Sequence, residues 1–92
     1  MLIKGSKSKI YIKGKSEDSI PLIFIHGFMG SSSSWDTIRE NINQKSYAID
    51  IPGHGKSTFI NIKEEYTFND FAIEFFLLLN TLNINKINLC GY

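Results

Sequence analysis

Hydrophobic residues along the chain gather into short runs that end at glycines, and the run at residues 22–26 organises the others. Its sequence, LIFIH, is followed by Gly27 and Gly30. Short apolar runs bounded by turn residues are typical of strands that are buried on both faces in parallel sheets. Two more such runs, SYAIDI at residues 46–51 and KINLC at residues 86–90, also end at glycines. We therefore predict three buried, parallel strands.

The first fifteen residues follow a different pattern. Residues 2–4 and 9–13 alternate apolar and polar positions, and Gly5 lies between them. Alternation predicts strands with one face in solvent, and the glycine favours a hairpin. We expect an antiparallel hairpin at one edge of the sheet.

Two segments show helical spacing. Trp35, Ile38 and Ile42 predict a helix over residues 34–43, capped by Ser33 or Ser34, with Asp36 in its first turn. The second helix follows a polar connection at residues 56–66 and starts at a capping box formed by Thr67 and Asp70. Its predicted polar face carries Asn69, Asp70 and Glu74, and its predicted apolar face carries Phe68, Phe71, Ala72, Phe75, Phe76, Leu79 and Leu82.

The order strand, helix, strand, helix, strand with short connections predicts an α/β fold. We expect a mostly parallel sheet with an antiparallel edge hairpin, flanked by two helices. Ninety-two residues allow one domain, residues 1–92.

Composition and charge exclude several classes of function. Ten basic and nine acidic residues give a net charge of +1, and no basic cluster points to nucleic acid. The longest apolar run is too short to cross a bilayer, and no signal peptide is recognisable, so we expect a cytoplasmic protein without a membrane partner. Cys90 is the only cysteine, which excludes an internal disulfide and Cys/His metal spacing. We expect Cys90 in the core, no metal and no cofactor.

The glycine turn after residues 22–26 is the candidate functional feature. A strand, a glycine turn and a helix start place several backbone N–H groups at the carboxyl end of a strand, where open α/β sheets bind ligands. This loop is a candidate anion or oxyanion site. The serines at 31–34 either cap the helix or also contact an anion. Arg39 and Lys56 either attract such an anion or are ordinary solvated charges, and we favour solvated charges.

Three stretches together resemble the amino-terminal half of an α/β-hydrolase. They are His26-Gly27-Phe28 after the first buried strand, DIPGHGKS at residues 50–57, and Gly91-Tyr92 after the third. The resemblance implies that the backbone N–H of Phe28 is an oxyanion-hole donor, and that Gly27, Phe28 and Tyr92 line the pocket and the nucleophile elbow. It also implies that His26 and His54 are architectural.

The same resemblance makes the domain incomplete. Gly91 and Tyr92 match the first two positions of the G-x-S-x-G elbow, so the chain ends just before the expected nucleophile, and the acid and base of the triad come later in the family. We therefore expect these 92 residues alone to be inactive. We also expect the strand at 86–90 to present an unpaired apolar edge that causes self-association.

Within the superfamily, HGFMGSSSSW and DIPGHGKS most resemble the 2-succinyl-6-hydroxy-2,4-cyclohexadiene-1-carboxylate synthases of menaquinone biosynthesis. That group eliminates pyruvate from a small-molecule substrate and is therefore a group of lyases on a hydrolase scaffold. General esterases and C–C bond hydrolases share the same motifs and stay open as alternatives. A further alternative is a non-catalytic remnant or binding fragment.

Overall fold

A computed structural model describes residues 1–27 and 29–91 of the chain. The strands are β1 (Leu2–Lys4), β2 (Ser8–Gly14), β3 (Leu22–Ile25), β4 (Ser46–Ile49), β5 (Thr58–Phe59) and β6 (Asn88–Gly91). A 3₁₀ helix, η1 (Ser32–Trp35), leads into α1 (Asp36–Asn41), and the longer helix α2 (Phe68–Thr81) precedes β6.

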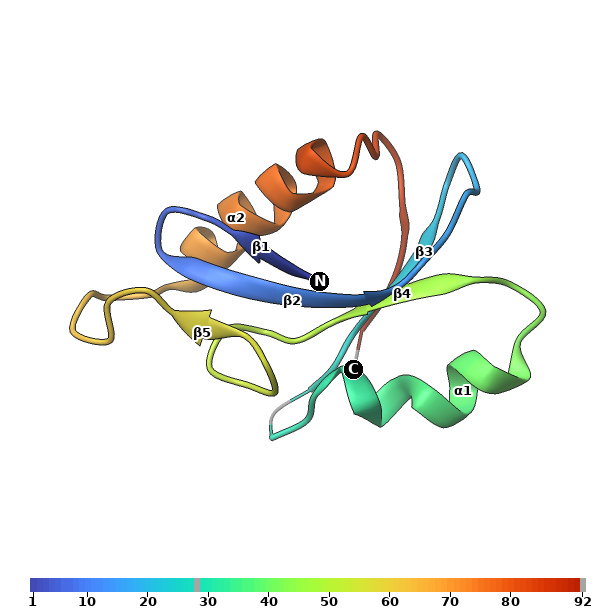
Figure 1. The fold of residues 1–92 in the computed structure, drawn as a ribbon, viewed down its shortest axis with the longest axis horizontal. Helices are drawn as coiled ribbons and strands as arrows, with labels where there is room; N and C mark the ends of the chain where they lie inside the picture. Colours follow the sequence, from blue (N-terminus) through green and yellow to red (C-terminus); the bar gives the residue numbers. More distant parts are fainter. Residues whose placement is uncertain (28, 92) are drawn as a thin grey trace.

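The strands form one sheet in the order β1-β2-β4-β3-β6, with β5 paired to β2 outside this path. The three predicted buried strands, β4, β3 and β6, pair in parallel, and β1, β2 and β5 pair antiparallel. Helices α1 and α2 lie on opposite faces of this sheet (Figure 1). The prediction of an α/β fold with a parallel core and an antiparallel edge hairpin is confirmed.

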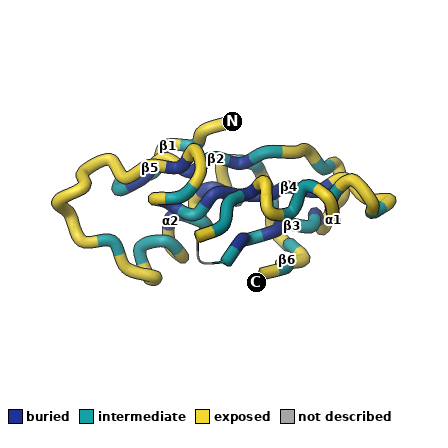
Figure 2. The backbone as a smooth tube through the Cα atoms, turned by 90° about the horizontal axis from the view of Figure 1, so that it is seen from below, coloured by how far each residue is buried: buried dark blue, intermediate teal, exposed yellow. Residues whose placement is uncertain are grey.

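The core lies where β2, β4 and β3 meet α2. Five hydrophobic residues of these elements are almost fully buried and form one cluster: Ile10, Ile12, Ile23, Ile49 and Leu78. Figure 2 shows buried stretches of backbone along β2, β4 and β3. On the other face of the sheet, the Trp35 ring packs on Phe24 with 4.6 Å between ring centroids. The centre of the sheet is therefore fixed on both faces.

The apolar face predicted for α2 is confirmed in part: Phe71, Phe75, Leu79 and Leu82 pack against the core, but other positions depart from the prediction. Phe68 is 90% exposed and Phe76 is largely exposed, whereas Glu74, which was assigned to the polar face, is only 4% exposed. Apolar side chains surround this helix on almost every side, so hydrophobic spacing alone does not select the buried face. The capping box is confirmed, because Thr67 Oγ1 accepts the Asp70 N–H and Asp70 Oδ2 accepts the Thr67 N–H.

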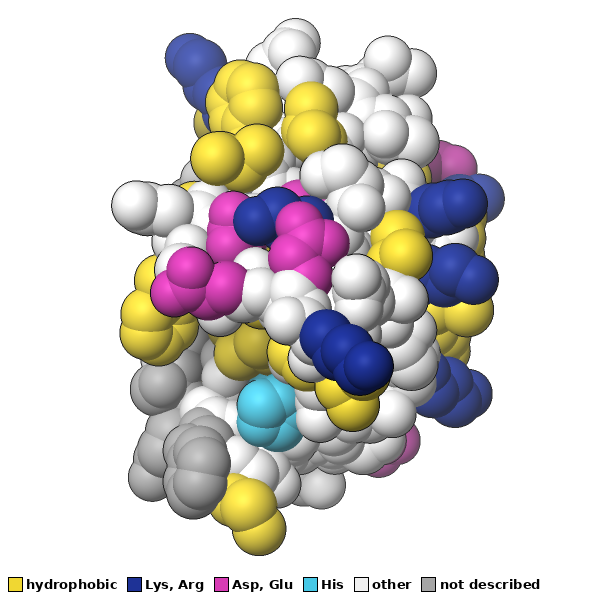
Figure 3. Space-filling model, turned by 90° about the vertical axis from the view of Figure 1, so that its left-hand side faces the viewer, with side chains coloured by type: hydrophobic (Ala, Val, Ile, Leu, Met, Phe, Trp, Pro, Cys, Tyr) yellow, Lys and Arg dark blue, Asp and Glu magenta, His cyan; other side chains and the backbone are white. Residues whose placement is uncertain are grey.

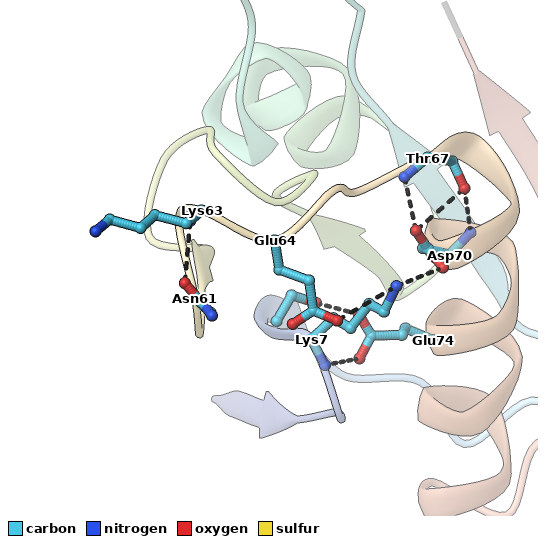
Figure 4. A network of polar contacts seen from close by, with 8 residues as sticks. Lys7, Asn61, Lys63, Glu64, Thr67, Asp70 and Glu74 are labelled. Atoms are coloured by element: carbon cyan, nitrogen blue, oxygen red, sulfur yellow. Dashed lines mark hydrogen bonds and ion pairs between the residues drawn. The ribbon is translucent and has the colours of Figure 1, made fainter.

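Glu74 is buried because it clamps the β1–β2 hairpin to α2. Its Oε2 accepts the Lys7 N–H at 3.1 Å and its Oε1 accepts the Ser8 hydroxyl at 2.8 Å. Beside this contact, Lys7 Nζ forms ion pairs with Asp70 and Glu64 (Figure 4).

Tyr66 lies next to Ser8 in the same cluster. Burial raises the pKa of Tyr66 to about 12, against the lowering effect of its Ser8 hydrogen bond.

The segment around the first helix also differs from prediction. The helical region starts as 3₁₀ at Ser32 and its N-cap is Ser31, not Ser33 or Ser34. The predicted polar connection at 56–66 contains β5, a two-residue strand that tertiary pairing with β2 creates. In the turn after β3, Met29 takes the left-handed conformation (φ 64°) and Gly30 does not. Space around Gly30 is tight, since a Cβ there would lie 3.1 Å from the Gly27 carbonyl oxygen.

Strand β6 lies at the edge of the sheet and is less buried than predicted. Leu89 is 56% exposed and Cys90 is half-buried, so the expectation of a core cysteine is wrong. The other edge of β6 has no strand beside it among the described residues. Within residues 1–27 and 29–91, no helix has the length and hydrophobicity needed to cross a membrane.

Candidate active site

The candidate site lies at the carboxyl ends of β3 and β4, and His26 joins the two loops that leave them. The His26 side chain is almost fully buried. Its Nε2 accepts the Ile51 N–H at 2.9 Å, and its Nδ1 lies 2.8 Å from the Gly27 carbonyl oxygen, to which it donates. These two contacts set the Nδ1–H tautomer and occupy both ring nitrogens. The architectural role expected for His26 is therefore what its geometry supports.

Asp50 makes a second connection between the same loops. Its side chain is 2% exposed, its Oδ1 accepts the Ser32 N–H at 2.6 Å, and its Oδ2 accepts the Lys56 N–H at 2.8 Å. Burial alone would raise the pKa of Asp50, but the Lys56 and Ser32 N–H groups outweigh burial and hold that pKa below its ordinary value of 3.8. The carboxylate is thus held in its charged form.

The backbone N–H groups at the start of η1 all have partners. Ser31 N–H donates to Ser34 Oγ, Ser33 N–H donates to Ser31 Oγ, and Ser34 N–H donates to the Ser31 carbonyl. The Ser32 N–H is taken by Asp50. Of the two interpretations left open for the serines, capping is the one the structure supports, and the place of an external anion is filled by the chain's own carboxylate.

The glycines after β4 make the Asp50 contacts possible. Gly53 and Gly55 both have positive φ, 87° and 53°, as the turn prediction requires. A Cβ on Gly55 would collide with the Asp50 carboxylate. Ser57 closes the loop, because its hydroxyl donates to the Asp50 carbonyl at 2.6 Å and accepts the Tyr11 N–H at 2.7 Å. The motif at residues 50–57 therefore forms a loop whose end, at Lys56 and Ser57, is hydrogen-bonded back to Asp50 at its start.

An open, mostly apolar cleft of about 750 Å³ adjoins these loops. Ile51, Pro52 and His54 line it from the β4 side, and Tyr66, Phe68 and Phe71 line it from the α2 side. Figure 3 shows this side of the molecule, with a histidine among hydrophobic side chains below a group of opposite charges. The His54 ring lies 5.0 Å from that of His26, and its buried Nδ1 has no hydrogen-bond partner among the described residues.

The structure describes only some of the residues predicted to form the oxyanion hole and the nucleophile elbow. Phe28 and Tyr92, the predicted oxyanion donor and elbow residue, lie outside the described residues, so those assignments stay predictions. The Gly27 carbonyl accepts the Gly30 N–H at 3.0 Å, which closes the turn at the end of β3. Gly91 pairs with Ile25, so the end of β6 lies beside that turn. The pocket role of Gly27 stays a prediction.

The two cations considered for anion binding have structural contacts instead. Arg39 donates to Ser46 Oγ and to the Ser46 carbonyl at the far end of β4. Lys56 Nζ lies 4.8 Å from the centre of the Tyr11 ring. In the part of the chain that the structure describes, no group of three or more His, Cys, Asp or Glu side chains is placed to hold a metal ion.

Sequence reasoning quoted Asp50 within a motif but gave it no role. The available signal was an acid between a buried strand and a Pro-Gly turn, where a charged side chain must find donors. What the pattern did not show is that one of those donors comes from η1, eighteen residues earlier in the chain.

Comparison with known proteins places this arrangement in a family. The family model described as "alpha/beta hydrolase fold" matches residues 20–92. The 2-succinyl-6-hydroxy-2,4-cyclohexadiene-1-carboxylate synthase of Citrobacter koseri is 41% identical over 75 residues, which cover 77% of this chain and 27% of that protein. The sn-1-specific diacylglycerol lipase ABHD11 of Danio rerio is 33% identical over 79 residues, covering 82% of this chain and 24% of the lipase.

Solved structures agree on the fold. The N-acyl homoserine lactonase AidH, in complex with N-butanoyl homoserine, has a TM-score of 0.81 at 25% identity, covering 97% of this chain and 34% of the lactonase. Measured against its first curated relatives, the chain spans only 5% to 27% of their lengths. The matched family model and the strand-end motifs together establish that this chain belongs to the α/β-hydrolase family.

Proposed function

We propose that this chain is the amino-terminal part of an α/β-hydrolase-fold lyase that eliminates pyruvate to form 2-succinyl-6-hydroxy-2,4-cyclohexadiene-1-carboxylate in menaquinone synthesis. The observation that carries the proposal is the 41% identity to a synthase of that name over 77% of the chain. The match to the Danio rerio lipase is lower, at 33%, and the 44% match to the probable lysophospholipase BODYGUARD 4 of Arabidopsis thaliana covers less of the chain, 62%.

The contribution of these residues to such a reaction is electrostatic. An elimination or acyl transfer on this fold builds negative charge on a substrate oxygen, and preorganised N–H groups stabilise that charge. Such donors must be held in place, and the residues on either side of the turn after β3 are tied to the loop after β4 by His26 and Asp50. The donor itself is proposed at Phe28, with Gly27 and Tyr92 beside the substrate.

The nucleophile, the general base and the acid of the proposed triad belong to the part of the parent protein that follows Tyr92. Residues 1–92 alone are therefore proposed to be inactive. The proposed cellular location is the cytoplasm.

The test uses the native gene product, purified from its own source, with its intact mass measured first. A mass far above 10.5 kDa, a serine at position 93, and pyruvate release from the menaquinone precursor would support the proposal. Hydrolysis of simple esters or of a C–C bond, without pyruvate release, would support the esterase or C–C hydrolase alternative. A mass that matches 92 residues, with no turnover, would make the chain a non-catalytic remnant.

A further inference from the structure

Two neighbouring residues at the end of β4 hold the segment between β3 and α1 at both of its ends. The Ile51 N–H binds His26, immediately before the turn at 27–30, and the Asp50 carboxylate binds the Ser32 N–H, immediately after it. The residues that flank this turn, His26 and Ser32, are therefore both tied to the loop after β4. The neighbouring β3–β6 pairing places Gly91 beside Ile25, at the base of the same turn.

The contact made by Asp50 differs chemically from the contact made by His26, because its acceptor is charged. One carboxylate uses separate oxygens for two N–H donors from different loops, at 2.6 Å from Ser32 and 2.8 Å from Lys56. Hydrogen bonds from N–H groups to an ionised acceptor are shorter and stronger than neutral ones. No neutral side chain of the same size supplies two acceptor oxygens, because an asparagine replaces one of them with an N–H₂ donor.

We propose that Asp50 is a positioning residue for the reaction: its carboxylate couples the turn after β3 to the loop after β4 and so fixes the oxyanion-stabilising segment relative to the end of β6. The inference rests on the proposed function for its catalytic consequence. The coupling itself does not depend on which substrate the parent protein uses.

The structure offers a matched control. Asp36 lies in the first turn of α1, a few residues beyond Ser32, and its half-exposed carboxylate pairs with Lys13. Asp36→Asn makes the same chemical change as Asp50→Asn, on the same side of the sheet, without touching either loop contact.

The kinetic test compares both variants in the native gene product. Because displacement of about 1 Å at a catalytic group costs about 10²-fold, we expect Asp50→Asn to lower kcat for pyruvate release by about 10- to 100-fold. KM should change little, and Asp36→Asn should leave both constants unchanged. Equal kcat values in Asp50→Asn and the unsubstituted protein would overturn the proposal.

A second measurement needs no variant and no substrate, so it holds even if Asp50→Asn fails to fold. The amide NMR signals of Ser32 and Lys56 are followed through an acid titration of the folded protein. Charged or titratable neighbours of Asp50 are His26 after β3, His54 and Lys56 in its own loop, and Tyr11 of β2. We expect both amides to shift together with one shared midpoint below 3.8, the ordinary pKa of an aspartate carboxyl.

The two measurements separate the inference from the proposed function. Separate midpoints, or no response of either amide, would overturn the role of Asp50 whatever the reaction is. A shared midpoint in a protein that releases no pyruvate would retain the coupling and reject the proposed reaction.

Discussion

Two buried carboxylates, Asp50 and Glu74, have similar surroundings but serve different parts of the molecule. Both are nearly inaccessible, both accept backbone N–H groups, and each is packed against a glycine whose Cβ would collide with it, Gly55 and Gly5 respectively. Asp50 joins two loops at the carboxyl ends of β3 and β4. Glu74 joins an edge hairpin to a helix, away from those loops. Burial and hydrogen bonding alone therefore do not show whether an acid serves the candidate site or only stabilises the fold. The two acids differ in which elements of the structure they join.

The largest expected effect on stability belongs to Glu74. Glu74→Ala leaves the half-buried Lys7 N–H without this acceptor, while the Ser8 hydroxyl keeps Tyr66 as its other partner, so we expect a loss of about 1–3 kcal/mol in the free energy of unfolding, the cost of one unpaired group. Urea denaturation measures it, with the exposed Glu40→Ala as control. A loss of kcat in the folded variant would contradict the division between the two acids.

Gly55 and Gly5 each pack against one of the two acids, so substitutions there displace one carboxylate at a time. Gly55→Ala forces a side chain into a left-handed backbone, at about 1–2 kcal/mol, and also displaces the Asp50 carboxylate. Gly5→Ala displaces the Glu74 carboxylate instead. We expect both to lower the melting temperature but only Gly55→Ala to lower kcat. Equal kcat values in the two variants would break the comparison.

Acid stability tests the charged state of Asp50. Since its folded pKa is lowered, its contribution is fully present above 3.8 and is lost as the pH falls through the folded pKa. The Asp70 pKa is lowered in the same direction by the Thr67 N–H and by Lys7. We expect Asp50→Asn to remove part of the decline in unfolding free energy below 3.8, measured by denaturation at several pH values. An unchanged decline would contradict a charged Asp50.

The smallest expected effect on stability comes from a substitution at the edge strand β6, which neither acid contacts. Leu89 is exposed on a strand that pairs only with β3 among the described residues, and a lysine on such an edge hinders pairing with another chain. We expect Leu89→Lys to reduce self-association of the 92-residue chain in sedimentation experiments, with a change within about 0.5 kcal/mol in stability. Undiminished association would place the contact elsewhere.

The sequence predicted most elements because short apolar runs and glycine turns are local signals. The strands β3, β4 and β6 and both helices follow from them. It did not predict β5, since a two-residue strand exists only through its partner β2. It predicted the buried face of α2 only in part, because apolar residues occur on most sides of that helix: Phe71 and Phe75 pack on the core as expected, whereas Glu74 is buried and Phe68 is exposed. The role of Asp50 was missed because its donor Ser32 is distant in sequence.

The most direct test of the division between Asp50 and Glu74 is hydrogen exchange of the Ser32 amide in the folded gene product. Asp50→Asn and Glu74→Gln are compared with the unsubstituted protein. We expect exchange at Ser32 to accelerate about tenfold or more in Asp50→Asn, the value of a hydrogen bond to a charged group, and to be unchanged in Glu74→Gln. Equal acceleration in both variants, or none in Asp50→Asn, would contradict it.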